Sequence, residues 1–363
     1  MTSPASSSPA SPSGLALPRP IARAIAAVYG RVAAGRRRRA RRADTTRRLR
    51  QPVVSVGNLS LGGTGKTPVV AHLAALLRDG GERPAVLSRG YARTAPREGV
   101  VVVRDADRLR ADLPTSGDEP LMLARALQGV AVVVADDRHL AGVLAESRLG
   151  ATVHVLDDGF QHVGLARDVD LVLVDPADLQ QGEVVPAGRL REPVDAARHA
   201  DAWLVPEGQA VELSADAARF GVEHVFEVRR RLGVPRMIEP WNTPPRVPRA
   251  RPVAALAGIA SPQRFFDALE AEGWQVVARL AFGDHHPFVP RDLARVAEAM
   301  RAAGAELLLT TEKDVMRLLP LRPLPAPVAW VPLSVEVLPV EAFQTWLAAR
   351  LAAARRARRG NRA

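Results

Sequence analysis

The feature that most constrains the fold of this chain is the run VVSVGNLSLGGTGKTPVV at residues 53–70. Its first four residues, Val53–Val56, are apolar or small and have the pattern of a short buried strand. A glycine-rich turn follows and ends in Lys66 and Thr67, and an apolar helical run begins at Val69. A strand, a glycine-rich turn, a Lys-Thr pair and a helix in this order are typical of a loop that binds nucleotide phosphates.

The composition of this loop follows from the chemistry of phosphate binding. Backbone N–H groups must turn inward around a phosphate, and side chains would block that approach. In such a loop the lysine reaches the β- and γ-phosphates of ATP and the threonine hydroxyl binds Mg²⁺. The predicted phosphate-binding residues are Ser60, Leu61, Gly62, Gly63, Thr64, Gly65, Lys66 and Thr67. Because Ser60 stands where the common spacing has glycine, a glycine-rich turn with a chance Lys-Thr pair remains the alternative.

The net charge of +11 is unevenly distributed along the 363 residues. Residues 1–50 carry +11 and residues 350–363 carry +6, so residues 51–349 carry −6. A nucleic-acid-binding protein usually carries its positive charge on the folded body or on a dedicated module. We therefore expect no nucleic-acid partner, and an anionic membrane surface is at least as good a match for the basic ends. No protein partner is evident, and the absence of cysteine excludes disulfides and thiolate metal sites.

The amino-terminal region divides into two parts. Residues 1–16 are rich in Ser, Pro and Ala and are predicted to be disordered. Within residues 17–50, an apolar face recurs at helical spacing opposite a face of arginines, and an arginine cluster follows at 36–42. The apolar face consists of Ile21, Ile25, Val28, Tyr29 and Val32. This pattern is typical of a helix in the headgroup layer with a basic anchor, and a helix docked on the protein is an equal alternative.

Residues 51–225 alternate short apolar strands with helices, which predicts an α/β domain with a parallel sheet covered on both faces. Ligands bind beyond the carboxyl ends of the strands in such sheets. Several polar clusters follow these strands or open helices, so we expect them to converge on the phosphate loop. They are SRGY at 88–91, SGDEP at 116–120, ADDR at 135–138 and DDGFQH at 157–162.

Three acidic residues of these clusters have the placement that phosphoryl transfer requires. Asp157 ends an apolar strand, and a carboxylate at that point suits Mg²⁺ coordination, which Asp158 can share. Asp118 stands at the start of a helix and can act as a general base. The alternative for the pair Asp157-Asp158 is a turn, and the alternative for Asp118 is a helix cap.

The remaining segments predict a linker and a second, smaller α/β domain. Residues 226–252 are proline-rich toward their end and form the predicted linker, residues 253–349 form the second domain, and residues 350–363 form a basic tail. In the loop PAGRLREP at 186–193, Arg191 and Glu192 can contact nucleotide, close a hinge or form a surface ion pair. In DHHPF at 284–288, His285 is better explained as a partner that tunes a carboxylate across the cleft than as a zinc ligand.

Seven motifs in a fixed order make the chain resemble the tetraacyldisaccharide 4′-kinase family of Gram-negative bacteria over residues 18–345. They are VGNLSLGGTGKTP, SRGY, SGDEP, DDGFQH, PAGRLREP, DHHPF and TTEKD. The resemblance implies two α/β/α domains joined by a two-stranded linker, with ATP in the cleft. It also implies that the γ-phosphoryl group of ATP goes to the 4′-hydroxyl of a tetraacylated glucosamine disaccharide 1-phosphate, giving lipid IVA. The implied location is the cytoplasmic face of the inner membrane, with the amino-terminal helix inserted in the leaflet.

The resemblance also implies a role for each matching residue. Asp118 matches the catalytic base, and His285 matches the histidine that pairs with it. Lys66 matches the phosphate-binding lysine, and Thr67, Asp157 and Asp158 match the groups linked to Mg²⁺. Three further residues match polar residues of the active-site cleft: Arg138, Arg191 and Glu192.

Two other functions are left open by the residues themselves. One is a soluble P-loop ATPase that works as a conformational switch, and the other is a nucleic-acid-stimulated ATPase suggested only by the arginines. A kinase consumes ATP in proportion to phosphorylated lipid, and a switch does not. The charge of −6 on residues 51–349 argues against the nucleic-acid alternative.

Overall fold

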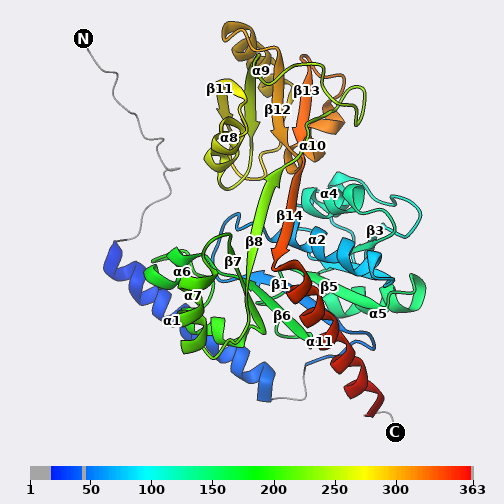
Figure 1. Ribbon diagram of the computed structural model, residues 1–363, viewed down its shortest axis with the longest axis vertical. Helices are drawn as coiled ribbons and strands as arrows, with labels where there is room; N and C mark the ends of the chain where they lie inside the picture. The colour runs from blue at the N-terminus through cyan, green and yellow to red at the C-terminus, as the bar shows by residue number, and fades with distance from the viewer. Residues whose placement is uncertain (1–17, 43–45, 361–363) are drawn as a thin grey trace.

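The computed structural model describes residues 18–42 and 46–360, so the predicted disordered segment 1–16 lies outside the described residues. Two sheets form two domains that are stacked along the long axis of the molecule (Figure 1). The sheet of the first domain has nine strands in the order β14-β8-β7-β6-β1-β5-β2-β4-β3. The sheet of the second domain has five strands in the order β11-β10-β12-β13-β9.

The elements have the following bounds. The strands of the nine-stranded sheet are β1 (Val53–Asn58), β2 (Pro84–Ser88), β3 (Val101–Arg104), β4 (Ala131–Val134), β5 (Val153–Asp157), β6 (Val169–Leu173), β7 (Ala202–Pro206), β8 (Val225–Leu232) and β14 (Leu333–Leu338). Those of the five-stranded sheet are β9 (Arg236–Met237), β10 (Pro252–Ala257), β11 (Gln275–Ala281), β12 (Leu307–Thr311) and β13 (Val328–Val331). The helices are α1 (Arg19–Arg42), α2 (Lys66–Asp79), α3 (Leu113–Ser116), α4 (Asp118–Ala126), α5 (Arg138–Arg148), α6 (Pro176–Gln181), α7 (Ala210–Arg219), α8 (Pro262–Ala271), α9 (Pro290–Ala302), α10 (Glu312–Leu318) and α11 (Val340–Gly360), with 3₁₀ turns at Val194–His199 and Leu319–Leu321.

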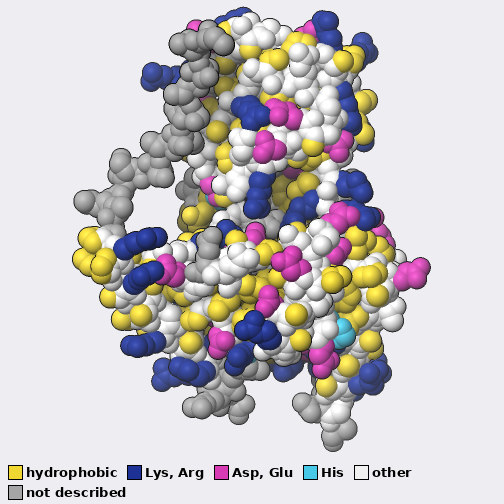
Figure 2. Space-filling model, turned by 60° about the vertical axis from the view of Figure 1, so that its left-hand side comes forward, with side chains coloured by type: hydrophobic (Ala, Val, Ile, Leu, Met, Phe, Trp, Pro, Cys, Tyr) yellow, Lys and Arg dark blue, Asp and Glu magenta, His cyan; other side chains and the backbone are white. Residues whose placement is uncertain are grey.

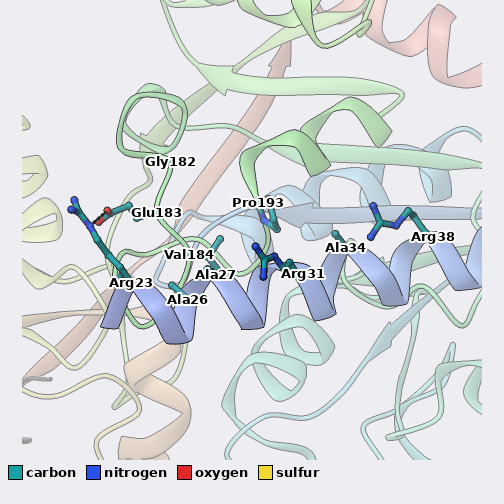
Figure 3. Close-up of a pocket in the computed structure, with 12 residues that line it drawn as sticks. Arg23, Ala26, Ala27, Arg31, Ala34, Arg38, Gly182, Glu183, Val184 and Pro193 are labelled. Carbon is teal, nitrogen blue, oxygen red and sulfur yellow. Dashed lines mark hydrogen bonds and ion pairs between the residues drawn. The ribbon is translucent and has the colours of Figure 1, made fainter. Parts of the chain in front are cut away.

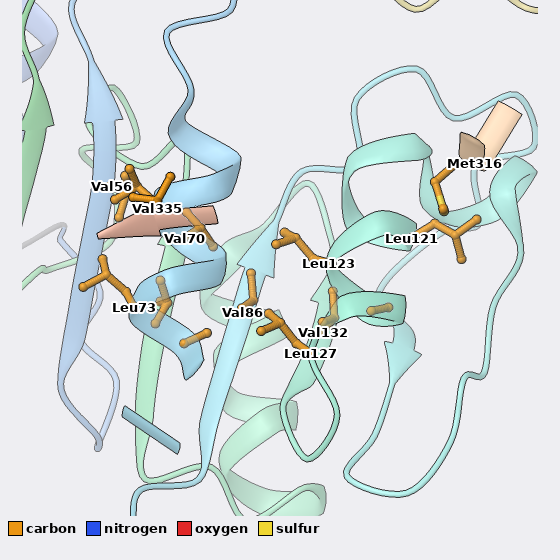
Figure 4. Close-up of a cluster of buried hydrophobic side chains, with 14 of the residues drawn as sticks. Val56, Val70, Leu73, Val86, Leu121, Leu123, Leu127, Val132, Met316 and Val335 are labelled. Carbon is orange, nitrogen blue, oxygen red and sulfur yellow. The ribbon is translucent and has the colours of Figure 1, made fainter. Parts of the chain in front are cut away.

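The core of the first domain explains why its strands are continuous apolar runs. Strand β1 is buried along its whole length and pairs in parallel with β5 and β6. Helix α2 covers it, burying Val70 and Leu73 against the sheet (Figure 4). A parallel strand with helices on both faces has no solvent-exposed side, so apolar residues occupy successive positions. The predicted α/β class, with a parallel sheet next to the phosphate loop and a second α/β domain, is confirmed.

The chain passes between the two domains through β8 and β14, and this changes the predicted domain bounds. The two strands pair antiparallel: β8 runs from the first sheet toward the second domain, and β14 runs back to the first domain (Figure 1). The predicted linker 226–252 therefore contains most of β8, which is a strand of the first sheet. The predicted second domain, 253–349, and the tail after it also differ from the structure, because β14 and α11 return to the first domain. Helix α11 has an apolar face, Phe343, Leu347 and Leu351, that is buried in the core.

The domains also meet directly through α4 of the first and α10 of the second. Leu121 and Met316 lie against each other in a hydrophobic cluster that includes residues of both domains (Figure 4). Nearby, the Arg125 guanidinium lies 5.5 Å from the centre of the Trp241 ring. Since α4 begins at Asp118, this packing fixes the position of that residue relative to the second domain.

Candidate active site

The phosphate loop has the backbone geometry that its glycines predict. Gly65 has a φ of 81°, in the left-handed region that favours glycine, and a Cβ atom there would lie 3.0 Å from Nε of Arg230. Helix α2 begins at the next residue, Lys66. The unpaired N–H groups of its first turn therefore face the loop, which is the arrangement that binds phosphate.

The loop is held on one side by the PAGRLREP segment. The Leu61 N–H donates to the Arg189 carbonyl at 2.7 Å, and the Arg191 N–H donates to the Leu59 carbonyl at 2.7 Å. Ser60 is buried, and its hydroxyl donates to the Asp178 carboxylate at 2.9 Å. The residue that departs from the common spacing thus anchors the loop to the domain through its side chain.

Lys66 belongs to a charge cluster built entirely from the first domain. Its ammonium donates to Oδ1 of Asn58 at 2.9 Å and lies 3.4 Å from Oδ1 of Asp158. Arg191 binds both oxygens of Asp158, at 2.8 and 2.6 Å. Burial acts to raise the pKa of Asp158, but Lys66 and Arg191 outweigh it and hold the pKa below its usual value. Asp158 is therefore ionised and holds two cations at the loop.

Asp157, at the end of β5, has a different environment. It is buried, and its carboxylate accepts a hydrogen bond from the Ser88 hydroxyl at 3.2 Å. Burial, followed by the charges of Glu119 and Asp158, raises its pKa to about 7, against the opposing effect of Lys66. Such a concentration of negative charge suits a bound cation.

The oxygen groups here fit a magnesium ion, which prefers carboxylates, hydroxyls and water. Within residues 18–42 and 46–360, no group of three or more His, Cys, Asp and Glu side chains is placed to hold a metal. Mg²⁺ typically binds through one or two carboxylates and completes its shell with nucleotide phosphates and water. The carboxylates of Asp157 and Asp158 and the hydroxyl of Thr67 are groups of the kind that such a site uses.

The structure gives Arg138 and Glu192 different surroundings. Arg138 begins α5 and is buried; burial, then Arg89, lowers its pKa, while Asp157 and Asp158 act to raise it. Glu192 is also buried, but its two oxygens accept from Arg37 of α1, at 2.7 and 2.9 Å. Glu192 therefore attaches the amino-terminal helix to the segment that carries Arg191.

The second charge cluster contains Asp118 and is built from both domains. Asp118 is 2% exposed and opens α4 behind Gly117, where a Cβ atom would lie only 2.4 Å from the Tyr91 carbonyl oxygen. The SRGY and SGDEP motifs therefore pack backbone to backbone. His285 of the second domain places Nδ1 at 3.0 and 2.9 Å from the two oxygens of Asp118.

His285 has a strained backbone conformation, which its surroundings hold in place. Its φ of 56° lies in the left-handed region, which costs a non-glycine residue on the order of 1–3 kcal/mol. The His285 N–H donates to the Gly258 carbonyl at 3.2 Å, and the rings of His285 and Tyr91 have centroids 5.0 Å apart. Two residues after Gly258, Ala260 lies next to the phosphate loop, 3.4 Å from where a Cβ of Gly63 would stand. One segment of the second domain thus contacts both His285 and the phosphate loop.

The charges around Asp118 keep it ionised. Burial acts to raise its pKa, but the hydrogen bond with His285 and the charges of Lys313 and Arg317 lower it below the usual value. Nε of Arg317 lies 3.4 Å from Oδ2 of Asp118. An ionised carboxylate accepts hydrogen bonds only, so it can accept a proton from a bound hydroxyl group.

Four residues of the phosphate loop's surroundings and the two clusters were assigned no role in the sequence analysis. Asn58 and Lys313 lie within quoted motifs, whereas Arg317 follows TTEKD by one helical turn. Arg230 lies in an arginine run of β8, and its guanidinium donates to the Thr64 carbonyl of the phosphate loop at 3.0 Å. The position of Lys313 in the TTEKD motif indicated a functional residue. Its contact with His285, 28 residues earlier, could not be predicted from spacing alone.

Comparison with known proteins places the chain in a family. The sequence pattern of the family described as tetraacyldisaccharide-1-P 4′-kinase matches residues 19–352. A tetraacyldisaccharide 4′-kinase of Geobacter metallireducens is 42% identical over 281 residues, covering 76% of this chain and 80% of that protein. One of Rhodopseudomonas palustris is 43% identical over 295 residues, covering 81% of each.

A solved structure extends the similarity to the fold. The crystal structure of LpxK from Aquifex aeolicus in complex with ATP superposes with a TM-score of 0.74 at 30% identity, covering 92% of this chain and 99% of that one. Both α/β domains and both charge clusters therefore lie within a chain that is similar to these proteins over most of its length. The chain belongs to the tetraacyldisaccharide-1-P 4′-kinase family.

Proposed function

We propose that this protein transfers the γ-phosphoryl group of ATP to the 4′-hydroxyl of a tetraacylated glucosamine disaccharide 1-phosphate, giving lipid IVA in lipid A biosynthesis. Family membership and the similarity to an ATP-bound relative support this reaction. The observation that carries the assignment of the site is the contact between Asp118 and His285, a carboxylate of one domain held by a histidine of the other.

On the nucleotide side, residues 60–67 surround the phosphates of ATP. Lys66 neutralises charge on the transferring phosphoryl group, and Asn58 and Asp158 keep its ammonium oriented. Arg191 is held at the same point by Asp158. Arg138, a buried cation beside the aspartate pair, adds positive charge for the phosphates.

The aspartate pair and Thr67 fit the magnesium ion that accompanies ATP. When bound, Mg²⁺ neutralises negative charge on the phosphate oxygens. Calorimetric titration with Mg²⁺-ATP tests this fit.

On the acceptor side, Asp118 orients the 4′-hydroxyl and accepts its proton. The hydroxyl oxygen then forms a bond to the γ-phosphorus as the bond between that phosphorus and the β–γ bridging oxygen breaks, leaving ADP. A carboxylate with a low pKa is a weak base, but in phosphoryl transfer the proton moves late and positioning supplies most of the rate. His285 fixes the carboxylate in that position.

We further propose that α1 lies in the headgroup layer at the cytoplasmic face of the inner membrane. The helix uses its small residues, Ala22, Ala26 and Gly30, to dock on the first domain. Its apolar stripe is left 44–60% exposed: Ile21, Ile25, Val28, Tyr29 and Val32. Figure 2 shows apolar side chains with arginines beside them at this end of the molecule. No helix among the described residues is long and apolar enough to cross a bilayer, so the helix lies along the surface in this proposal.

A shallow groove between α1 and residues 182–193 supports the same placement. Its floor contains Ala26, Ala27 and Val184, and Arg31 and Arg38 stand at its edge (Figure 3). Arg23 closes one end by an ion pair with Glu183 at 2.7 Å. An apolar floor with cationic edges matches the boundary between acyl chains and anionic headgroups.

The reaction is tested by incubating the protein with labelled ATP and the acylated disaccharide 1-phosphate and separating the lipids by chromatography. We expect one phosphorylated lipid for each ATP consumed. ATP hydrolysis without lipid phosphorylation would contradict the proposal and favour a switch ATPase, and stimulation by nucleic acid would favour the third function.

The membrane placement is tested by flotation with vesicles containing anionic lipid. Replacing Ile25, Val28 and Val32 by Asp removes apolar side chains that each contribute about 1.5–3 kcal/mol when buried, so flotation should fall at least tenfold. The matched control is Val211→Asp on α7, which is 91% exposed in the first domain. Equal flotation of both variants would contradict the role of α1.

A further inference from the structure

Lys313 stands out in the sequence of this protein because lysine is almost absent from it. Of the 50 basic residues, 48 are arginine, and the two lysines are Lys66 and Lys313. Lys66 lies in the phosphate loop. Lys313 lies in α10 of the second domain, and its ammonium is in contact with the other charge cluster. In a chain that uses arginine nearly everywhere, a compact ammonium at this position indicates a role that a broad, planar guanidinium does not fill.

The ammonium of Lys313 contacts the free nitrogen of His285. The distance from Nζ to Nε2 is 3.0 Å, while Nδ1 of the same ring faces Asp118 at 2.9 Å. An ammonium has three hydrogen-bond donors and no acceptor. Nε2 must therefore present its lone pair to Lys313, and the ring proton must be on Nδ1, where it is donated to Asp118.

Lys313 is charged in this environment, so the argument applies at neutral pH. Burial acts to lower its pKa, but the carboxylates of Glu119, Asp118 and Asp284 outweigh burial and raise it. Two of them are in contact with Nζ: Glu119 at 3.2 Å and Asp284 at 3.1 Å. A second proton on His285 would place an imidazolium against this ammonium.

The other groups facing His285 do not replace Lys313 in this function. Asp284 lies 3.9 Å from Nε2, beyond hydrogen-bonding distance, and Tyr91 presents its ring. Arg317 contacts Asp118 on the other side of the hydrogen bond. The ionised Asp118 requires the proton on Nδ1, and Lys313 is the group among the described residues whose contact keeps a second proton off Nε2.

We propose that Lys313 is a positioning residue of the phosphoryl transfer, which keeps a second proton off Nε2 of His285, so that the ring stays neutral and donates its Nδ1 proton to the ionised Asp118. The proposal rests on the roles given above to Asp118 and His285. Without Lys313, Nε2 can take up a second proton while Nδ1 keeps its proton toward the Asp118 carboxylate. The imidazolium that results makes Asp118 a weaker base.

The test reads the ring nitrogens directly in ¹⁵N-histidine-labelled full-length protein, by two-bond ¹H–¹⁵N correlation spectra across the neutral pH range. His285→Ala identifies the signals by their loss. We expect the wild type to show the neutral form with Nδ1 protonated and Nε2 unprotonated. In Lys313→Met we expect Nε2 to become protonated. An unchanged pattern in Lys313→Met would overturn the proposal, whatever the activity of that variant.

The kinetic test separates positioning from direct contact with substrate. Lys313→Met should lower kcat at least about tenfold, a part of the 10²–10⁴-fold that general base catalysis supplies, with KM for ATP little changed. In a His285→Ala background the same substitution should lower kcat less than about twofold. A full tenfold loss in both backgrounds would show that Lys313 acts independently of His285, which overturns the proposal.

Glu119→Gln tests whether Lys313 acts through His285 or only through its ion pair with the first domain. It removes the interdomain ion pair of Lys313 but leaves the contact with His285. The Nε2 signal should stay unprotonated in this variant, and a change equal to that of Lys313→Met would overturn the proposal. The spectra need no lipid, so they test the role of Lys313 even if the protein does not phosphorylate the lipid. Failure of the proposed reaction and failure of the proposed role of Lys313 are therefore distinguishable.

Discussion

The two charge clusters of the cleft differ in how they are built. The Lys66 cluster takes Asn58, Asp158 and Arg191 from the first domain alone, from the ends of neighbouring strands and the segment paired with the loop. The Asp118 cluster takes one carboxylate from the first domain and its partners His285, Lys313 and Arg317 from the second. Figure 2 shows the hollow between the two domains, with cationic side chains at its edge.

The Lys66 cluster and the Asp118 cluster therefore depend on different parts of the fold. The Lys66 cluster is fixed by the hydrogen bonds of one sheet. The Asp118 cluster exists only while α4 and α10 are packed together, because its partners lie on opposite sides of that contact. Changes at the domain interface should therefore disturb base catalysis and leave nucleotide binding in place.

The largest effect is expected for Lys66→Ala. The variant should lose at least about 100-fold in kcat, since the lysine stabilises charge on the transferring group. The spectra of His285 should be unchanged, because the Asp118 cluster shares no contact with Lys66. Arg78→Ala, near the other end of α2, is the matched control. Retention of more than about a tenth of the wild-type kcat would contradict the assignment of the loop.

The Asp118 cluster should show strongly non-additive losses. Asp118→Ala and His285→Ala should each lower kcat by about 100-fold with KM for ATP little changed, since general base catalysis typically contributes 10²–10⁴-fold. The double variant should be scarcely worse than Asp118→Ala, because residues that act as one unit lose their effect together. Losses that multiply would mean that His285 is a structural or lipid-phosphate contact.

A smaller effect is expected from Met316→Ala at the contact between α4 and α10. The truncation should cost about 2–5 kcal/mol in stability, and at a temperature where the variant is folded it should lower kcat about tenfold with unchanged KM for ATP. Leu347→Ala in α11, also buried, is the matched control and should lose stability without losing kcat. Equal kcat in the two variants would contradict the dependence of base catalysis on this interface.

The smallest effect concerns the pH dependence of the first domain. Burial, together with Arg138 and Arg167, lowers the pKa of His162 to about 4 from its ordinary value of 6.5. Between these values the unfolded chain binds more protons than the folded one, so stability falls as pH decreases. His162→Gln should remove this loss and so raise the free energy of unfolding at pH 5, with no comparable gain at pH 7. Urea unfolding at both pH values measures it, and a gain that is the same at both would refute the assignment.

The sequence was sufficient for one half of the site and part of the other. The strand-to-helix geometry at 53–70 is local, and the rule that strand ends meet at one edge of a parallel sheet brought Asp157 and Asp158 to the loop. Motif order connected Asp118 with His285 through the family resemblance. The surroundings of Glu192 could not be predicted, because its partner Arg37 lies 155 residues earlier in a run of arginines that look alike.

By itself, the sequence determined the strand that begins at Val53, the phosphate loop and the helix that follows. It also determined that Asp157 and Asp158 come at the end of a buried strand. Short-range backbone preferences and apolar periodicity govern all of these features. Only the tertiary structure decided that β14 and α11 return to the first domain, that α1 exposes its apolar stripe, and that Lys313 meets His285. These outcomes depend on which apolar faces find a partner and on contacts between residues far apart in the chain. Local sequence pattern does not predict such contacts, because they form only when the two domains pack together.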